Sequence, residues 1–182
     1  QDRLPIRTFI CKFEESIIKK AIESEVQRGG QVFFLHNRVQ DIQNLTDELR
    51  AMVPDVRFRF AHGQMQEDDL EKVMIAFFNH DFDVLICTTI IESGMDIPRA
   101  NTIIIDRANT LGLSQLYQLR GRVGRSKERA YCYLLVPQSG VIDPTAQERL
   151  RVLQENSDLG SGLRVAHHDL ELRGAGSILG EE

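Results

Sequence analysis

The sequence predicts an α/β protein: a three-layer α/β/α domain around a largely parallel sheet, with a short helical and loop appendage at its C-terminal end. Two observations predict this class. Short apolar runs alternate along the chain with segments whose apolar residues recur at helical spacing, which is the pattern of successive strand and helix units. Runs such as 84–87 and 102–105 are almost continuously apolar, as strands covered by helices on both faces must be.

Six strands are expected, at residues 8–13, 31–36, 56–61, 83–89, 101–106 and 130–136. Helices are expected at 15–27 and 39–52, where apolar residues recur every three or four positions. A third helix is expected to begin at Glu67, because Glu67, Asp68 and Asp69 suit the positive end of a helix dipole. It is expected to continue with Phe77 and Phe78 on its inner side.

Domain organisation follows from length and from a change in composition. A chain of 182 residues with 42% hydrophobic residues can bury one substantial core and leave a short appendage. After Pro137 come a polar turn, a helix expected at about 145–154 and the glycine-rich stretch 158–180. We therefore expect the main lobe at 1–137 and the appendage at 138–182.

Composition also restricts the functions that the chain can have. A net charge of -5 argues against binding nucleic acid by bulk positive charge, so contacts with DNA would have to be local. Three widely spaced cysteines, with no C-x-x-C pair, favour a reduced, cytoplasmic protein. No apolar stretch approaches the ~20 residues of a membrane span. The adjacent His167 and His168 are not placed to share a metal, and we expect no metal site.

The sharpest signal is the segment Gln118-Leu-Arg-Gly-Arg-Val-Gly-Arg125, which is expected on a short helical stretch. On a helix, Arg122 and Arg125 would lie on one face at i and i+3. A pair of guanidinium groups suits a polyphosphate, because guanidinium stays charged and donates in a planar fork. A solvated basic turn is the alternative interpretation. A phosphate-binding P-loop is excluded, since Leu119 and Arg125 replace its essential glycine and lysine.

A second segment, 88–98, directly follows the expected strand 83–89. Ligands of parallel α/β sheets gather at the carboxyl ends of the strands. The hydroxyls of Thr88 and Thr89 are therefore candidates to meet a backbone phosphate, and Asp96 to accept a hydrogen bond from a ribose hydroxyl. Glu92 and Asp96 as a catalytic carboxylate pair is an alternative, although acids at i and i+4 are more often solvated. His62 and Gly63 follow another strand at the same expected edge.

In this order, the segments resemble the C-terminal RecA-like lobe of superfamily 2 helicases, with 88–98 matching motif V and 118–125 matching motif VI. The tail segment 168–174, His-Asp-Leu-Glu-Leu-Arg-Gly, resembles the translocation motif shared by RecG and the transcription-repair coupling factors. Residues 104–108, 173–176 and 180–182 look more like the coupling factors. We expect the far end of that motif to lie beyond residue 182.

The resemblance implies roles for particular residues. Arg122 and Arg125 would approach the γ-phosphate of ATP, and Gly94, Asp96 and Gln118 would face the nucleotide. Nucleic-acid contacts would come from Thr88, Thr89, His62 and Gly63. Arg149 and Arg173 would couple ATP turnover to movement along double-stranded DNA.

The resemblance also implies what is supplied from outside these residues. The sequence contains no G-x-x-x-x-G-K-[ST] and no Asp-Glu pair at a strand end. ATP with Mg²⁺ would therefore be bound mainly by the N-terminal RecA-like lobe, and the chain alone is expected to be inactive. RNA polymerase and repair proteins would dock elsewhere on the parent protein. Two alternatives stay open: a lobe of a RecG-like branch-migrating helicase, and a non-enzymatic adaptor with the same fold.

Overall fold

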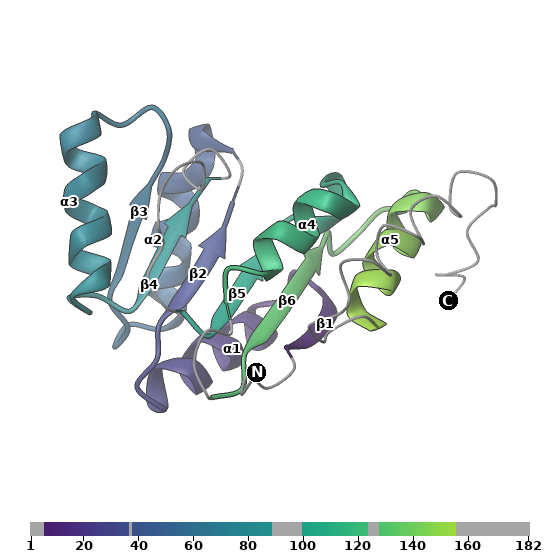
Figure 1. Cartoon of the computed structure of the whole chain (residues 1–182), viewed down its shortest axis with the longest axis horizontal. Helices are drawn as coiled ribbons and strands as arrows, with labels where there is room; N and C mark the ends of the chain where they lie inside the picture. Colours follow the sequence, from purple (N-terminus) through teal and green to yellow (C-terminus); the bar gives the residue numbers. More distant parts are fainter. Residues whose placement is uncertain (1–5, 37, 89–99, 124–127, 156–182) are drawn as a thin grey trace.

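A six-stranded, wholly parallel sheet forms the centre of the computed structural model, which describes residues 6–36, 38–88, 100–123 and 128–155 (Figure 1). Along the sheet the strands are ordered β1-β6-β5-β2-β4-β3. Their bounds are β1 Arg7–Lys12, β2 Val32–Leu35, β3 Phe58–Ala61, β4 Val84–Cys87, β5 Thr102–Ile105 and β6 Tyr131–Val136. All six strands were predicted from the sequence, each with an observed span shifted or shortened by no more than a few residues.

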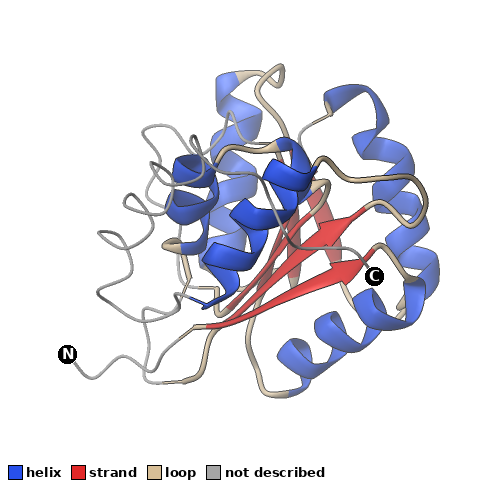
Figure 2. Ribbon diagram, turned by 90° about the vertical axis from the view of Figure 1, so that its right-hand side faces the viewer, coloured by secondary structure: helices blue, strands red, loops and turns tan. Residues whose placement is uncertain are grey.

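Helices cover both faces of the sheet, as the continuously apolar strands predicted (Figure 2). The helices are α1 Glu15–Gln27, α2 Ile42–Met52, α3 Glu67–Phe78, α4 Leu113–Arg120 and α5 Pro144–Glu155, with short 3₁₀ turns at η1 Val39–Asp41 and η3 Ala108–Thr110. Buried side chains of α1 and α2 pack on one face, and those of α3, α4 and α5 pack on the other. The three-layer α/β/α prediction is confirmed.

Successive side chains along each strand point to opposite faces of the sheet, and this divides the core into two layers. In β2, Phe34 packs with α1 and α2, whereas Phe33 packs toward the α3 side, where its ring lies 5.3 Å from that of Phe77. Successive side chains of a strand point to opposite faces. Both layers of the core are therefore built from the same short apolar runs.

The end of α1 shows why a glycine follows this helix. Gly29 has φ of +86°, and its N–H donates to the carbonyl of Val26, while the Gly30 N–H donates to that of Glu25. This pair of bonds closes the helix in a Schellman motif, in which the left-handed residue is usually glycine. The chain then enters β2 without leaving those helix carbonyls unsatisfied.

Helix α3 begins at Glu67 as predicted, but one of its expected inner residues faces outward. Phe77 is fully buried, whereas the Phe78 side chain is 71% exposed. The expectation for Phe78 was wrong: a helix turns by about 100° per residue, and the buried face of α3 is formed by Val73, Met74 and Phe77, so Phe78 falls on the outer side. Ile75, at i−3 from Phe78, is also exposed.

The expected appendage begins with a helix that shares the core of the domain. Leu150, Val152 and Leu153 of α5 are buried in the same cluster as the sheet and α4. Residues 156–182, with Arg173 and the resemblance to the translocation motif, lie outside the described residues. The boundary between 137 and 138 therefore stays a prediction.

An ion pair at the amino edge of the sheet joins the start of β3 to the start of β4. The Asp83 carboxylate accepts hydrogen bonds from the Arg57 backbone N–H at 2.9 Å and from its guanidinium at 3.0 and 3.3 Å. Burial raises the pKa of the Asp83 carboxyl, but these hydrogen bonds outweigh burial and lower that pKa below its ordinary value.

We predict that Asp83→Asn lowers the free energy of unfolding at pH 7 and flattens its dependence on acid pH. A carboxyl whose pKa is depressed by folding stabilises the protein above its unfolded-state pKa, and this contribution is lost as the pH falls through the folded-state pKa. Urea unfolding between pH 7 and pH 3 measures the effect. Asp81→Asn is the matched control, because the Asp81 contact with Arg57 is made by its backbone carbonyl. Identical pH profiles for both variants would contradict the assigned role of Asp83.

Candidate functional site

The carboxyl edge of the sheet carries the residues that directly follow each strand. Because every strand is parallel, His62 after β3 and Thr88 after β4 reach the same edge. Their strands are neighbours, with Ala61 opposite Cys87 in the register. The structure thus brings together two of the predicted nucleic-acid contacts, which are 26 positions apart in sequence.

Local contacts hold the His62 loop against β3. The His62 ring stacks on Phe60 with centroids 6.0 Å apart, and its Nδ1 accepts a hydrogen bond from the Gln64 N–H. The His62 backbone N–H donates to the Met65 sulfur. Gly63 is exposed at the turn. The loop is thus ordered by its own residues and leaves backbone accessible at its tip.

Thr88 is buried, with 3% of its surface exposed, and its hydroxyl has no hydrogen-bond partner among the described residues. A buried hydroxyl without a partner costs free energy, so such a group needs an explanation. Its position at a carboxyl strand end, where ligands of parallel sheets bind, offers one. Thr89, Gly94 and Asp96 lie outside the described residues.

Motif VI begins on a helix but leaves it earlier than expected. Helix α4 ends at Arg120, so Gln118 is an exposed helical residue, whereas Arg122 lies in the turn that follows. The prediction that Arg122 shares a helix face with Arg125 was therefore wrong for Arg122, because Gly121 ends the helix first. Arg125 lies outside the described residues.

A single bridge places this turn in the fold. Val123 pairs in parallel with Ala100, just before the start of β5, which puts the half-buried Arg122 at the amino edge of the sheet. Segment 88–100 leaves β4 at the carboxyl edge and enters β5 at the amino edge. Ala100, which follows the motif V segment, therefore lies beside the turn of motif VI, on the opposite edge of the sheet from Thr88 and His62.

Arg120 is not part of a solvated basic turn. Its side chain is 2% exposed, its Nη1 donates to the Leu153 carbonyl at 2.8 Å, and its guanidinium lies 5.5 Å from the Tyr117 ring centroid. Arg120 therefore fastens α5 to α4. For this residue the alternative interpretation of the basic run was wrong.

Arg149, the coupling residue implied by resemblance, lies on α5 and points to the connection after β5. Its Nη2 donates to the Asn109 carbonyl at 3.4 Å, while its buried Nε has no hydrogen-bond partner in the described ranges. Asn109 belongs to η3, which precedes α4 and motif VI. Arg149 therefore contacts the connection that leads to Arg122.

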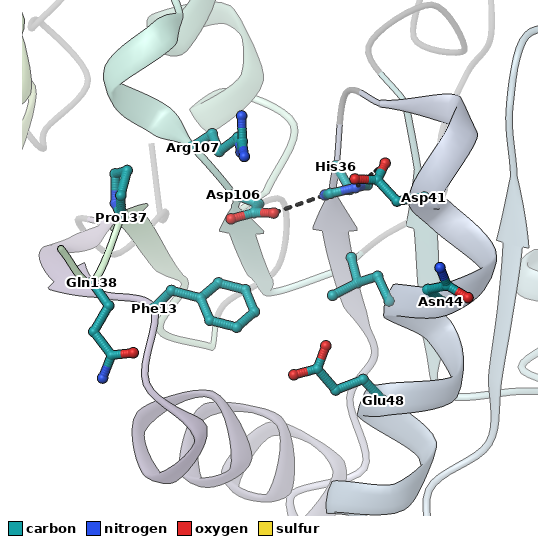
Figure 3. A pocket seen from close by; sticks show the side chains of 10 residues that line it. Phe13, His36, Asp41, Asn44, Glu48, Asp106, Arg107, Pro137 and Gln138 are labelled. Atoms are coloured by element: carbon teal, nitrogen blue, oxygen red, sulfur yellow. Dashed lines mark hydrogen bonds and ion pairs between the residues drawn. The ribbon is translucent and has the colours of Figure 1, made fainter. Parts of the chain in front are cut away.

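A cavity that was not predicted from the sequence lies at the carboxyl edge of the sheet. It has a volume of about 350 Å³ and lies where β2, β5 and β6 end and α2 begins (Figure 3). His36 and Asp106, which follow β2 and β5, line this cavity, and the His36 Nδ1 lies 2.7 Å from an Asp106 oxygen. The remaining lining residues are Phe13, Asp41, Asn44, Leu45, Glu48, Arg107, Pro137 and Gln138.

A sequence signal for this cavity existed. His36 ends one expected strand and Asp106 another, and the rule that ligands gather at carboxyl strand ends applies to both as it does to Thr88. The strand order could not be predicted from the sequence. It makes β2 and β5 neighbours, although 66 residues lie between Leu35 and Thr102 in the chain.

Within the described ranges, no group of three or more His, Cys, Asp and Glu side chains is arranged to hold a metal ion. Among the helices of those ranges, none is long and apolar enough to cross a membrane.

Comparison with known proteins identifies a family to which the sequence is similar. The family model of the helicase conserved C-terminal domain matches residues 14–127. The whole chain is 59% identical to a transcription-repair-coupling factor of Myxococcus xanthus and 49% identical to one of Staphylococcus epidermidis, and it covers 15% and 16% of their lengths.

Solved structures agree with this family. The structure of RecG bound to a three-way DNA junction is 35% identical, with a TM-score of 0.76 over 94% of this chain and 23% of that one. The yeast DEAD-box splicing factor Prp28 has a TM-score of 0.71 over 99% of this chain and 39% of its own, and its 16% identity shows the fold alone. The chain spans less than a sixth of the length of the Myxococcus relative.

Proposed function

Since the chain belongs to the helicase conserved C-terminal domain family, we propose that it is the second motor lobe of an ATP-driven double-stranded DNA translocase that acts in transcription-coupled repair. The bridge between Ala100 and Val123 carries this proposal. It joins Ala100, which follows the motif V segment, to motif VI at one edge of the sheet, while Thr88 at the start of that segment lies at the other edge. One connection thus links a nucleotide site to a DNA site.

At the amino edge, Arg122 supplies a half-buried guanidinium for the phosphates of ATP. Arg125, Gly94, Asp96 and Gln118 are proposed to complete this side of the nucleotide site. An arginine finger stabilises the charge of the transferring phosphoryl group and raises turnover by roughly 10³–10⁵-fold. The first lobe of the parent would bind most of ATP and its Mg²⁺.

At the carboxyl edge, Thr88, Thr89, His62 and Gly63 are proposed to hold the DNA backbone. Hydroxyl and backbone N–H groups bind phosphate without bulk positive charge. This accords with a chain whose net charge is -5. The buried Thr88 hydroxyl would gain the hydrogen bond that it lacks within the described residues.

Two alternatives have less support. A RecG-like lobe is the weaker assignment, because identity to RecG is 35% against 59% to the coupling factor. A non-enzymatic adaptor would need neither Arg122 nor the motif V segment.

Coupling of ATP turnover to movement along DNA is proposed for Arg149 and Arg173. RNA polymerase and repair proteins are proposed to bind elsewhere on the parent protein.

The chain alone should fold but hydrolyse no ATP, because it has no phosphate loop. Circular dichroism and a phosphate-release assay with Mg²⁺-ATP and duplex DNA test this. DNA-stimulated turnover by the pure chain that disappears in Arg122→Ala would contradict the proposal.

In the parent motor, Arg125→Ala should lower ATP turnover by about 10³-fold or more while leaving duplex binding intact, as expected for a finger. The matched control is Arg59→Ala, which removes an exposed arginine from β3. Turnover within about threefold of the parent would refute the finger role.

Thr88→Val in the parent should weaken duplex binding by roughly tenfold, the value of a lost hydrogen bond to a charged group, without lowering the melting temperature. Fluorescence anisotropy with labelled duplex measures the binding. Thr46→Val is the control, because the equally buried Thr46 hydroxyl already donates to the Ile42 carbonyl. A folded Thr88→Val protein with unchanged affinity would rule out the phosphate contact.

A further inference from the structure

A buried carboxylate joins α1 to the amino edge of the sheet. The Glu25 side chain is 1% exposed, and its two oxygens accept hydrogen bonds from the Arg28 guanidinium at 2.7 and 2.9 Å. The hydroxyl of Thr102, which is also buried, donates a third hydrogen bond to Glu25. A buried carboxylate is costly unless it is paired and hydrogen-bonded, and these three bonds meet that condition.

The Arg28 guanidinium reaches from the end of α1 to the segment that follows motif VI. Its Nη2 also donates to the Arg129 carbonyl, and its Nε lies 4.0 Å from a Glu128 oxygen. Its central carbon lies 5.2 Å from the centroid of the Tyr131 ring, at the start of β6. Arg28 therefore contacts three residues of the segment that returns the chain from motif VI to the sheet.

Thr102 connects the same carboxylate to the other side of the motif VI turn, residues 121–123. It is the first residue of β5 and lies two positions after Ala100, which pairs with Val123. Through its two partners, Glu25 thus holds the backbone on both sides of the turn that carries Arg122.

The backbone beside this carboxylate leaves no room for a larger residue. A Cβ atom on Gly30 would lie 1.8 Å from Glu25 Oε2, so a side chain there would displace the carboxylate from its partners. Gly30 does not have the left-handed φ of Gly29, so this position needs a small residue and not a special backbone conformation. The placement of Glu25 is therefore specified by more than one part of the sequence.

We propose that Glu25 and Arg28 are positioning residues for motif VI, which fix the backbone on both sides of its turn so that the Arg122 guanidinium is prearranged for the phosphates of ATP. The inference rests on the motor function proposed above, because Arg122 meets phosphate only in that function. Prearranged charge stabilises a transition state without reorganisation, and a misplacement of about 1 Å can lower a rate by ~10²-fold. Glu25 and Arg28 act through the turn and not on ATP itself.

An equivalent ion pair on α5 provides the matched control. Glu148 is buried and pairs with Arg151 at i and i+3, and the Arg151 side chain is 28% exposed, against 29% for Arg28. Arg151 also pairs with Glu155 on the same helix. A role in stability alone would be shared by both ion pairs, whereas positioning of motif VI belongs only to Glu25 and Arg28.

Hydrogen exchange in the parent protein tests the positioning directly. Glu25→Gln with Arg28→Met removes the pair without leaving a buried charge unpaired. Backbone amides in peptides that cover residues 118–123 and 128–131 should then exchange at least tenfold faster, as measured by mass spectrometry. Glu148→Gln with Arg151→Met should leave exchange in those peptides within about twofold. Unchanged exchange in the first double variant would overturn the positioning role, whatever the motor does with ATP.

ATP turnover connects the positioning to the chemistry. In the parent, Glu25→Gln with Arg28→Met should lower kcat at least tenfold while changing KM for ATP less than threefold, and the double variant on α5 should keep kcat within about twofold. Adding Arg122→Ala to the first double variant should lower kcat no further than Arg122→Ala alone, because both changes remove the same contact. Losses of kcat that multiply would show independent actions and would overturn a role that operates through Arg122.

Gly30→Ala gives a second test that keeps both charges. It should displace the Glu25 carboxylate and lower kcat at least threefold, whereas Gly112→Ala, whose Cβ would meet open space, should keep kcat within about twofold. Unchanged kcat in both Gly30→Ala and the Glu25 and Arg28 double variant would overturn the proposal. If Arg122→Ala alone left turnover unchanged, the proposed motor role of Arg122 would fail, and hydrogen exchange would still decide whether the ion pair positions the turn.

Discussion

Parallel pairing of all six strands is the constraint on which the rest of the structure depends. Antiparallel strands can be joined by tight hairpins, whereas each parallel neighbour requires a crossover that returns the chain to the starting edge. Among the described residues, the crossovers contain the helices α1, α2, α3 and α4, whose buried side chains cover both faces of the sheet. As a result, every strand delivers its following residue to one edge. Thr88, His62, His36 and Asp106 lie at that edge for no other reason.

The connection from β4 to β5 runs from the carboxyl edge of the sheet to its amino edge. A chain that leaves one edge and enters the next strand must span the sheet, and this one ends at Ala100 against Val123. Thr88 therefore lies at one end of this connection, and the turn that contains Arg122 lies beside its other end. This arrangement suits a lobe whose proposed task is to relate nucleotide state to DNA contact. Arg120 adds rigidity behind the turn by joining α4 to the core helix α5.

The carboxyl edge carries polar groups of two kinds. Over β3 and β4 it presents the Thr88 hydroxyl, which has no hydrogen-bond partner among the described residues, and a glycine-containing turn, followed by the acidic first turn of α3 at Glu67, Asp68 and Asp69. Over β5, β6 and β2 it presents carboxylates around His36. Because acidic groups lie on both parts of this edge, the proposed DNA contacts depend on individual hydroxyl and backbone N–H groups and not on local positive charge.

The sequence by itself determined the fold class, the six strands and the two segments that carry the helicase resemblance, because hydrophobic period and motif order are local properties of the chain. It also placed Thr88 and His62 at one edge, since that inference needs parallel strands but no strand order. Tertiary structure decided the rest. The exposure of Phe78 depends on which arc of α3 meets the sheet, and the burial of Arg120 depends on α5 lying across α4. The separation of Arg122 from Thr88 and the meeting of His36 with Asp106 depend on the neighbours of β5, which are long-range choices made by packing.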